Sequence, residues 1–194
     1  MRPIDRSEIL PIGDYERIRP HFRARLIEEK RARRVAVGEH LSVVFENRDS
    51  VLLQIQEMLR IERITAPQAI YHEIETYNDL IPAQGQLSIT VFVEIPDREL
   101  RERKLVELAG LEDTIGLDVD GVIFPAEGAP SAGAVRERTT AVHYLKVTLS
   151  PEAAEAIREQ TASCALVVNH PLYTARAELS RATLSRLAED IEAS

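Results

Sequence analysis

The chain twice carries an alternating run that leads into the start of a helix: Leu87-Ser88-Ile89-Thr90-Val91-Phe92-Val93-Glu94-Ile95-Pro96-Asp97 and Ala141-Val142-His143-Tyr144-Leu145-Lys146-Val147-Thr148-Leu149-Ser150-Pro151-Glu152. In each run apolar side chains occupy almost every second position, which is typical of a strand with one buried face. Asp97 and Ser150 are good N-cap residues, and Pro151 suits the first position of a helix. Each run is therefore predicted to be a strand followed by a helix.

A further strand is expected after each of these helices. The first helix ends at Gly110, a residue typical of helix C-termini, and two β-rich runs then flank Asp120-Gly121, a strong hairpin signal. The second helix leads to a strand at 165–169. The strand–helix–strand order thus occurs near 87–124 and again near 141–169, which makes a ferredoxin-like fold one candidate even though the hairpin adds a strand.

The first half is predicted to be helical around a single hairpin. Two β-rich runs on either side of a Gly-Glu pair predict that hairpin at 34–45. Caps, prolines and apolar spacing predict helices at 14–30, with an interruption or restart at Pro20, at 47–65 and at 67–77. A final amphipathic helix is expected at 179–191.

The expected fold class is therefore α+β: a helical N-terminal half with a β-hairpin, and a C-terminal sheet built from two strand–helix–strand units. The division falls at residues 1–82, the helical and arginine-rich half, and 83–194, the β-α-β half with its C-terminal helix. We expect the two halves to form one compact unit.

The composition is that of an ordinary globular protein. Of 194 residues, 44% are hydrophobic and 29% charged, which argues against global disorder. No apolar run approaches the roughly 20 residues that span a bilayer, and the N-terminus lacks the apolar core of a secretory signal. We therefore expect a cytoplasmic protein without membrane insertion. Its single cysteine, Cys164, excludes an internal disulfide, and the chain has no iron–sulfur or haem motif.

The charge is unevenly distributed. The net charge is -8, yet 17–34 contains eight basic residues and two acidic ones. This region is the predicted docking surface for a partner, with four candidate residues: Arg23, Arg31, Arg33 and Arg34. A basic helix face is more often solvated or paired internally, and that alternative stays open. Nucleic-acid binding is not favoured, because the chain is acidic overall and Phe22 is the one aromatic residue within this region.

The densest group of polar side chains is predicted around the turn at Pro67. Glu57 and Glu62 lie on the helix before it, while His72 and Glu75 share a face of the helix after it. Bundle metal sites combine glutamates with such a pair, so Glu62 and His72 are candidate metal ligands. A structural ion-pair network with Arg48, Arg60 and Arg63, the arginines of the helix before Pro67, is a simpler explanation for the presence of these acidic residues.

Two histidines belong to predicted strands. His143 shares its face with Leu145 and Val147 and is expected to point into the core, whereas His170 ends a strand where a loop could expose it. Cys164 begins an apparently buried strand and is expected to be a core residue rather than a nucleophile. The candidate polar site thus comprises Glu57, Arg60, Glu62, His72, Glu75, His143 and His170.

Several stretches resemble the bacterial family known as domain of unknown function 3501 (DUF3501). They are Arg19-Pro20-His21-Phe22-Arg23, Arg33-Arg34-Val35, Phe45-Glu46-Asn47-Arg48, Gln54-Ile55-Gln56-Glu57-Met58-Leu59-Arg60-Ile61-Glu62-Arg63, Tyr77-Asn78-Asp79-Leu80-Ile81-Pro82, Val142-His143-Tyr144-Leu145 and His170-Pro171-Leu172-Tyr173. The resemblance implies a genomic neighbourhood of rubrerythrin-like di-iron proteins and iron–sulfur oxidoreductases. It assigns no catalytic residue and brings no cofactor into the chain.

Two function classes follow. The first is an accessory or binding protein of a bacterial oxidative-stress or electron-transfer system, whose partners would be rubrerythrin-like or iron–sulfur oxidoreductase proteins. Docking would use the basic region 17–34 or an edge of the sheet. The alternative is a metal-dependent enzyme or sensor, with a Glu/His site at the junction of the two halves. Enzymatic activity, substrate, metal identity and homo-oligomerisation are left open by the sequence.

Overall fold

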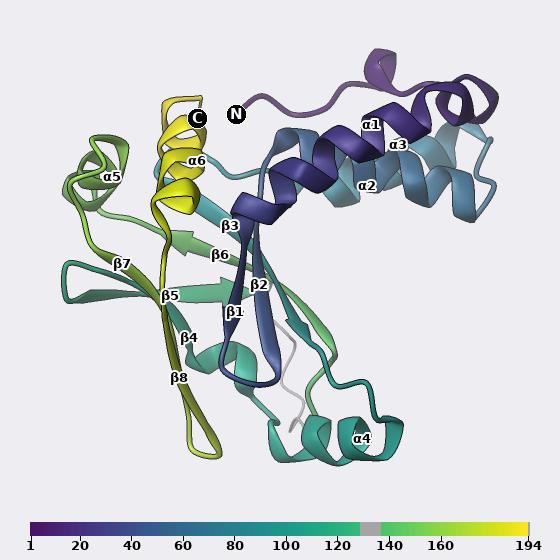
Figure 1. Cartoon of the computed structure of the whole chain (residues 1–194). Helices are drawn as coiled ribbons and strands as arrows, with labels where there is room; N and C mark the ends of the chain where they lie inside the picture. Colours follow the sequence, from purple (N-terminus) through teal and green to yellow (C-terminus); the bar gives the residue numbers. More distant parts are fainter. Residues whose placement is uncertain (129–136, 194) are drawn as a thin grey trace.

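The computed structural model describes residues 1–128 and 137–193 (Figure 1). Its helices are α1 (Ile12–Arg33), α2 (Arg48–Ile61), α3 (Pro67–Asn78), α4 (Arg98–Glu107), α5 (Pro151–Arg158) and α6 (Arg181–Glu192), with short 3-10 turns η1 (Arg6–Glu8) and η2 (Leu111–Thr114). The strands are β1 (Arg34–Val37), β2 (Leu41–Glu46), β3 (Gln86–Val93), β4 (Ile115–Val119), β5 (Val122–Gly128), β6 (Val142–Thr148), β7 (Cys164–His170) and β8 (Tyr173–Glu178).

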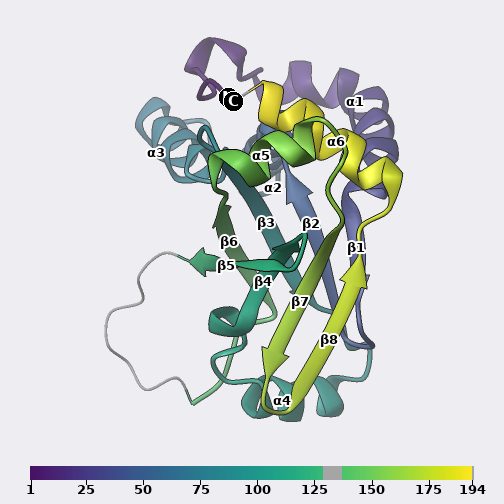
Figure 2. The ribbon, with the colours of Figure 1, turned by 90° about the vertical axis from the view of Figure 1, so that its left-hand side faces the viewer.

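The strands of the described residues form one antiparallel sheet in the order β1-β2-β3-β6-β5-β4-β7-β8. Figure 2 shows that the two ends of this order, β1 and β8, lie side by side. The Tyr173 hydroxyl at the start of β8 donates to the Val37 carbonyl (2.7 Å) and accepts from the His40 amide (3.1 Å). The sheet is therefore a nearly closed, eight-stranded barrel.

The barrel interior is filled by side chains from alternate positions of its strands. Val43, Val91 and Val147 are typical of these positions, with side chains that are almost wholly buried. Leu105 and Leu108 of the α4 segment and Leu187 of α6 join the same core. The alternation of apolar and polar residues explains this arrangement, because successive side chains on a strand point to opposite faces.

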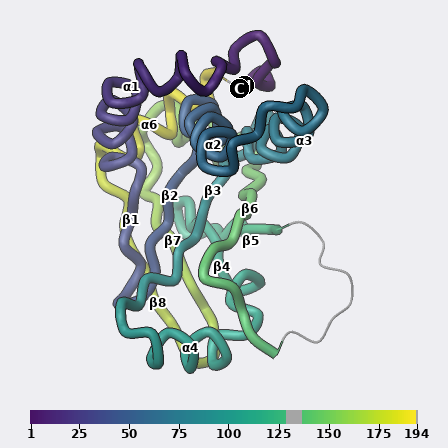
Figure 3. Tube along the Cα trace, turned by 90° about the vertical axis from the view of Figure 1, so that its right-hand side faces the viewer, coloured from purple at the N-terminus to yellow at the C-terminus, as the bar shows by residue number. Residues whose placement is uncertain are grey.

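A smaller apolar cluster holds the helices of the first half together. Its buried residues come from the N-terminal segment, α2, α3 and the segment after α3: Ile4, Ile9, Val51, Ile55, Leu59, Ile70, Ile74 and Ile81. Asn78 ties the N-terminal segment to α3, since its side chain both accepts from the Ile4 amide and donates to the Ile4 carbonyl. In Figures 1 and 3, α1, α2 and α3 gather at one end of the barrel and α4 lies at the other.

The fold class predicted from the sequence is wrong. The hairpin of β1 and β2 is not an appendage of a helical half, because β2 pairs with β3 and continues the sheet. Neither strand–helix–strand unit pairs its two strands: β3 and β4 are not neighbours, and β6 and β7 are not neighbours. The ferredoxin-like candidate is excluded because the strands do not form a separate C-terminal sheet: β1 and β2 of the first half belong to the same nearly closed, eight-stranded order, and β3 lies between β2 and β6. The boundary at 82/83 therefore divides strands of one sheet.

Most individual elements were predicted correctly, with two clear exceptions. Helix α1 runs without a break from Ile12 to Arg33 and contains Pro20, which lies on its exposed side where a missing N–H leaves no buried group unpaired. Strand β8 was not predicted at all. No helix among the described residues has the length and apolarity required to cross a membrane.

Candidate functional site

Glu57 lies in an ion-pair network between α1 and α2. Its carboxylate accepts hydrogen bonds from Arg19 Nε (2.6 Å), the Tyr15 hydroxyl (2.6 Å) and Arg60 (3.1 Å). The Arg19 bonds lead the effects that lower the pKa of Glu57 to about 2, against the opposing effect of burial. Burial and the Glu57 carboxylate in turn raise the pKa of Tyr15. Glu57 is thus a structural group that is ionised at neutral pH.

The three arginines expected near Glu57 lie in three different environments. Arg60 does pair with Glu57, as the network interpretation predicts. Arg48 instead binds Glu8 (2.6 Å) and the Arg2 carbonyl (3.0 Å) near the N-terminus. Arg63 lies exposed just beyond the end of α2.

The other acidic and histidine candidates of the helical half face solvent. Glu62 is not on the buried stripe of a helix: α2 ends at Ile61, and Glu62 is its exposed C-cap. His72 and Glu75 are exposed on α3. No group of three or more His, Cys, Asp or Glu residues suited to hold a metal ion occurs among the described residues, so Glu62 and His72 belong to no such group.

The two strand histidines are both buried, and each contacts different residues. His143 points into the barrel, as its alternation predicts, and its Nε2 is 2.9 Å from the Thr139 hydroxyl. His170 is buried rather than exposed: its Nδ1 accepts from the Leu172 amide and its Nε2 is 3.2 Å from the Ala109 carbonyl. With Nδ1 an acceptor, Nε2 carries the proton and donates to Ala109, so His170 is a satisfied structural residue.

A hydrogen-bonded chain around His143 was not anticipated from the sequence. The buried Thr139 hydroxyl, next to His143 Nε2, also donates to Glu112 at 3.2 Å. These residues line a cavity of about 940 Å³ beside β5 and β6. The local sequence around Glu112 and Thr139 does not indicate that they contact each other, because they come from different segments that are brought together only when the barrel forms.

Cys164 is a core residue, as expected. Its side chain is buried at the start of β7, and burial raises the pKa of the thiol to about 12. A thiol that stays protonated at neutral pH is a poor nucleophile.

The four arginines proposed for docking do not share one environment. Arg33 is buried, with a side chain only 4% exposed, and forms a bidentate ion pair with Asp190 of α6. Arg33 is therefore not available to a partner, which corrects that assignment. Arg31 pairs with Glu28 on the surface, and Arg34 pairs with Glu94. Arg23 is exposed and forms no ion pair with the described residues.

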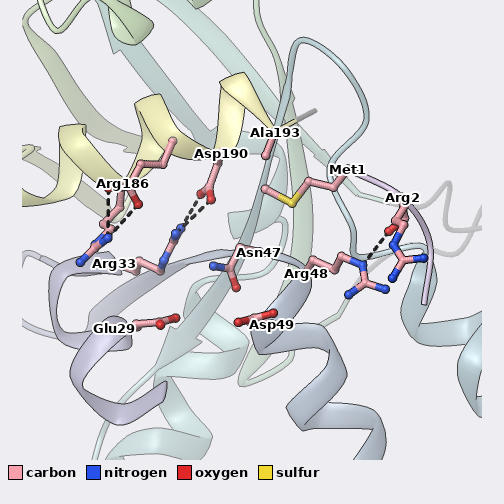
Figure 4. Close-up of a pocket in the computed structure, with 11 residues that line it drawn as sticks. Met1, Arg2, Glu29, Arg33, Asn47, Arg48, Asp49, Arg186, Asp190 and Ala193 are labelled. Atoms are coloured by element: carbon pink, nitrogen blue, oxygen red, sulfur yellow. Dashed lines mark hydrogen bonds and ion pairs between the residues drawn. The ribbon is translucent and has the colours of Figure 1, made fainter. Parts of the chain in front are cut away.

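A pocket of about 410 Å³ lies where α1, the start of α2 and the end of α6 meet (Figure 4). It lies at the junction of the N-terminal helices with the C-terminal part of the chain. Its lining combines basic, acidic and amide side chains: Arg2, Glu29, Arg33, Asn47, Arg48, Asp49, Arg186, Glu189 and Asp190, with Met1 and Ala193. Burial raises the pKa of Asp190, against the lowering effect of Arg33.

Comparison with known proteins connects this fold to a family. Residues 3–191 match the family model described as "Protein of unknown function (DUF3501)". The chain belongs to the DUF3501 family. A structural relative, from Burkholderia pseudomallei K96243 and described as a novel protein of unknown function, has 29% sequence identity and a TM-score of 0.91. That likeness covers 98% of this chain and 100% of the relative. No curated protein matches the sequence.

Proposed function

We propose that this member of the DUF3501 family is an accessory binding protein of a bacterial oxidative-stress or electron-transfer system. It docks an acidic partner through one face of α1. The residues of that face, here called the basic stripe, are Arg23, Ile27, Lys30, Arg31 and Arg34.

The spacing of the basic stripe supports this proposal. Positions 23, 27, 30, 31 and 34 recur at intervals of three and four, so they lie along one side of α1 and its junction with β1. The buried residues of α1, Tyr15, Leu26 and Arg33, lie on an adjoining side of the helix. Within the basic stripe Lys30 is partly buried, and the other four residues are exposed to solvent.

The charge of the stripe is only partly neutralised. Arg31 and Arg34 pair with Glu28 and Glu94, whereas Arg23 and Lys30 form no ion pair within the described part of the chain. Ile27, between them, is 49% exposed. An exposed apolar side chain ringed by cations suits an interface in which charge steers the encounter and apolar contact adds affinity.

The scatter of the polar candidates favours binding over chemistry. Glu57 is held in a structural network, His170 is satisfied by backbone groups, and His72 is exposed on a different element. A metal-dependent enzyme or sensor needs several of these side chains to converge. The described residues contain no group of three or more His, Cys, Asp or Glu side chains suited to a metal ion, so the binding protein is better supported than a metal-dependent enzyme or sensor.

The identity of the partner is proposed from the family resemblance. Rubrerythrin-like and iron–sulfur oxidoreductase proteins are the partners that the resemblance implies. Complementarity with the basic stripe adds the requirement that the docking surface of the partner be acidic.

A pull-down tests this proposal. The tagged full-length protein is incubated with the rubrerythrin-like and iron–sulfur oxidoreductase proteins of the same bacterium at low and at high salt. We expect one of them to be retained at low salt and released at high salt, because screening weakens exposed charge pairs. The double variant Arg23→Glu/Lys30→Glu should abolish retention.

The matched control is Arg17→Glu, a charge reversal on another side of the same helix, where Arg17 pairs with Asp14. It should retain the partner as the wild type does. Absence of any salt-sensitive partner, or equal loss of binding in the control, would overturn the proposal.

A further inference from the structure

The pocket between α1, α2 and α6 contains a buried donor that lacks an acceptor. The Arg33 side chain is 4% exposed, and its two terminal nitrogens are bonded to Asp190. Its Nε–H is buried and has no hydrogen-bond partner within the described residues. A buried, charged N–H left unpaired is costly, so an acceptor oxygen at this position would be stabilising.

The N-terminus of α2 opens into the same pocket. Asn47, Arg48 and Asp49 line it. The Asn47 side chain caps the Ser50 amide, while the amides of Arg48 and Asp49 belong to the first turn, where intrahelical acceptors are lacking. Since α2 has 14 residues, the positive end of its dipole also favours an anion here.

The same pocket provides one acid without a direct ion pair among the described residues, Glu29, whose charge acts on Arg186 at longer range. Asp49 pairs with Arg25, Glu189 with Arg186, and Asp190 with Arg33. Glu29 is half-buried and forms no ion pair among the described residues. Figure 4 shows Glu29 extending from α1 toward Asp49, while the guanidinium group of Arg33 points toward Asp190.

We propose that this pocket binds a small zwitterion of the α-amino-acid type. Its carboxylate is held by Arg33 Nε and the first amides of α2, and its ammonium group by Glu29. Glu29 and Arg33 are one helical turn apart, so their Cβ atoms are about 6 Å from each other, a separation that suits two opposite charges on one small molecule. The pocket volume of about 410 Å³ accommodates such a ligand.

A ligand with a single sign of charge fits less well. A simple anion would satisfy Arg33 but would lie close to Glu29 and Asp49, and a simple cation would satisfy Glu29 but leave the buried Nε–H unpaired. A zwitterion supplies both an acceptor for the Arg33 Nε–H and a positive charge for Glu29. The proposed site is independent of the basic stripe, because Glu29 and Arg33 lie on a different side of α1.

Isothermal titration of the full-length protein with a panel of free amino acids tests the proposal. The comparison set is the same compounds with the amine acetylated or the carboxylate esterified, together with acetate, inorganic phosphate and methylamine. We expect at least one free amino acid to bind, and every blocked form and single-charge probe to bind at least about tenfold more weakly, since each loses one charged contact.

Two variants locate the binding. Glu29→Gln removes the negative charge that pairs with the ammonium group and breaks no ion pair among the described residues, and it should weaken binding at least about tenfold. Arg33→Lys keeps a positive charge for Asp190 but loses Nε, and it should weaken binding similarly. Glu28→Gln, one residue away on the exposed surface where Glu28 pairs with Arg31, is the matched control and should bind like the wild type.

Two results would overturn the proposal. One is the absence of binding by every free amino acid at millimolar concentration, which would leave ordered water as the partner of Arg33 Nε. The other is equal binding of acetate or phosphate and the free amino acids, unchanged by Glu29→Gln, which would indicate a simple anion site.

Discussion

At the scale of single residues, several buried and half-buried charges are held by specific partners. Glu57 is the clearest case, because Arg19, Tyr15 and Arg60 all donate to its carboxylate while its side chain remains 20% exposed. The pKa of Glu57 is lowered to about 2, with hydrogen bonds from Arg19 as the leading cause. The ionised form is thus bound more tightly in the folded protein than in the unfolded chain.

This lowered pKa predicts a dependence of stability on pH. The contribution of Glu57 is fully present above its unfolded pKa, near 4.5, and is lost as the pH falls toward 2. After allowance for its partial solvent contact, we expect Glu57→Gln to cost about 2 kcal/mol at pH 7 and much less at pH 2.5. Urea unfolding at the two pH values measures this difference.

Glu62→Gln is the control for that experiment, because Glu62 is exposed at the end of α2. Its free energy of unfolding should match the wild type at both pH values. A cost of Glu57→Gln that is the same at pH 2.5 as at pH 7 would contradict the assignment of an ionised, hydrogen-bonded carboxylate.

At the scale of elements, the closure of the barrel depends on the turn between β1 and β2. Gly38 has a φ of 70°, and a Cβ atom at this position would lie 2.4 Å from the Tyr173 hydroxyl. Glycine is therefore required twice over, for the left-handed backbone and for the approach of Tyr173. The hydroxyl then joins the two end strands through Val37 and His40.

Removal of that hydroxyl should loosen the barrel. Tyr173→Phe keeps the ring but leaves the Val37 carbonyl and the His40 amide without their partner, at a cost of about 1–3 kcal/mol. Thermal or urea unfolding measures the change. Tyr71→Phe, which removes a hydroxyl from an exposed tyrosine of α3, should leave stability unchanged. Equal stability of Tyr173→Phe and wild type would show that other contacts close the sheet.

Local pattern predicted most elements because caps, turn residues and periodicity act over a few positions. Ser150 and Pro151 do begin α5, and Asp120-Gly121 does form the turn between β4 and β5. Strand β8 escaped prediction because its inward positions are Tyr173 and two alanines, which give a weak alternation of hydrophobicity.

At the scale of the whole molecule, strand neighbours could not be predicted from such patterns. The pairing of β2 with β3 joins residues about 45 positions apart across two helices, and the contact of β1 with β8 joins the ends of the sheet. Repeated strand–helix–strand order is compatible with parallel or antiparallel arrangements, and the packing of the complete chain selects between them.

The residues of the candidate site likewise fall into two groups: those whose position follows from the local sequence, and those whose position depends on a distant part of the chain. The inward direction of His143 follows from alternation within one strand, and it was predicted. The burial of Arg33 depends on Asp190, 157 residues later, and the burial of His170 on the Ala109 carbonyl, 61 residues earlier. The sequence around Arg33 and around His170 does not indicate these partners, so Arg33 and His170 were expected in more exposed positions.

Charge is also organised at the scale of the whole molecule. The net charge is -8, yet the basic stripe presents Arg23 and Lys30 without ion pairs within the described residues. A cationic surface on an acidic protein directs an acidic partner to one face and repels it elsewhere. This arrangement is the main physical basis for proposing a docking protein.

The most direct test of that claim is the affinity for the retained partner as a function of ionic strength, measured by biolayer interferometry from about 50 to 500 mM salt. We predict that the wild-type Kd rises at least about tenfold over this range, and that Arg23→Glu/Lys30→Glu shows weak binding with little dependence on salt. A wild-type Kd that is independent of salt, or a double variant that binds like the wild type, would contradict docking through the basic stripe.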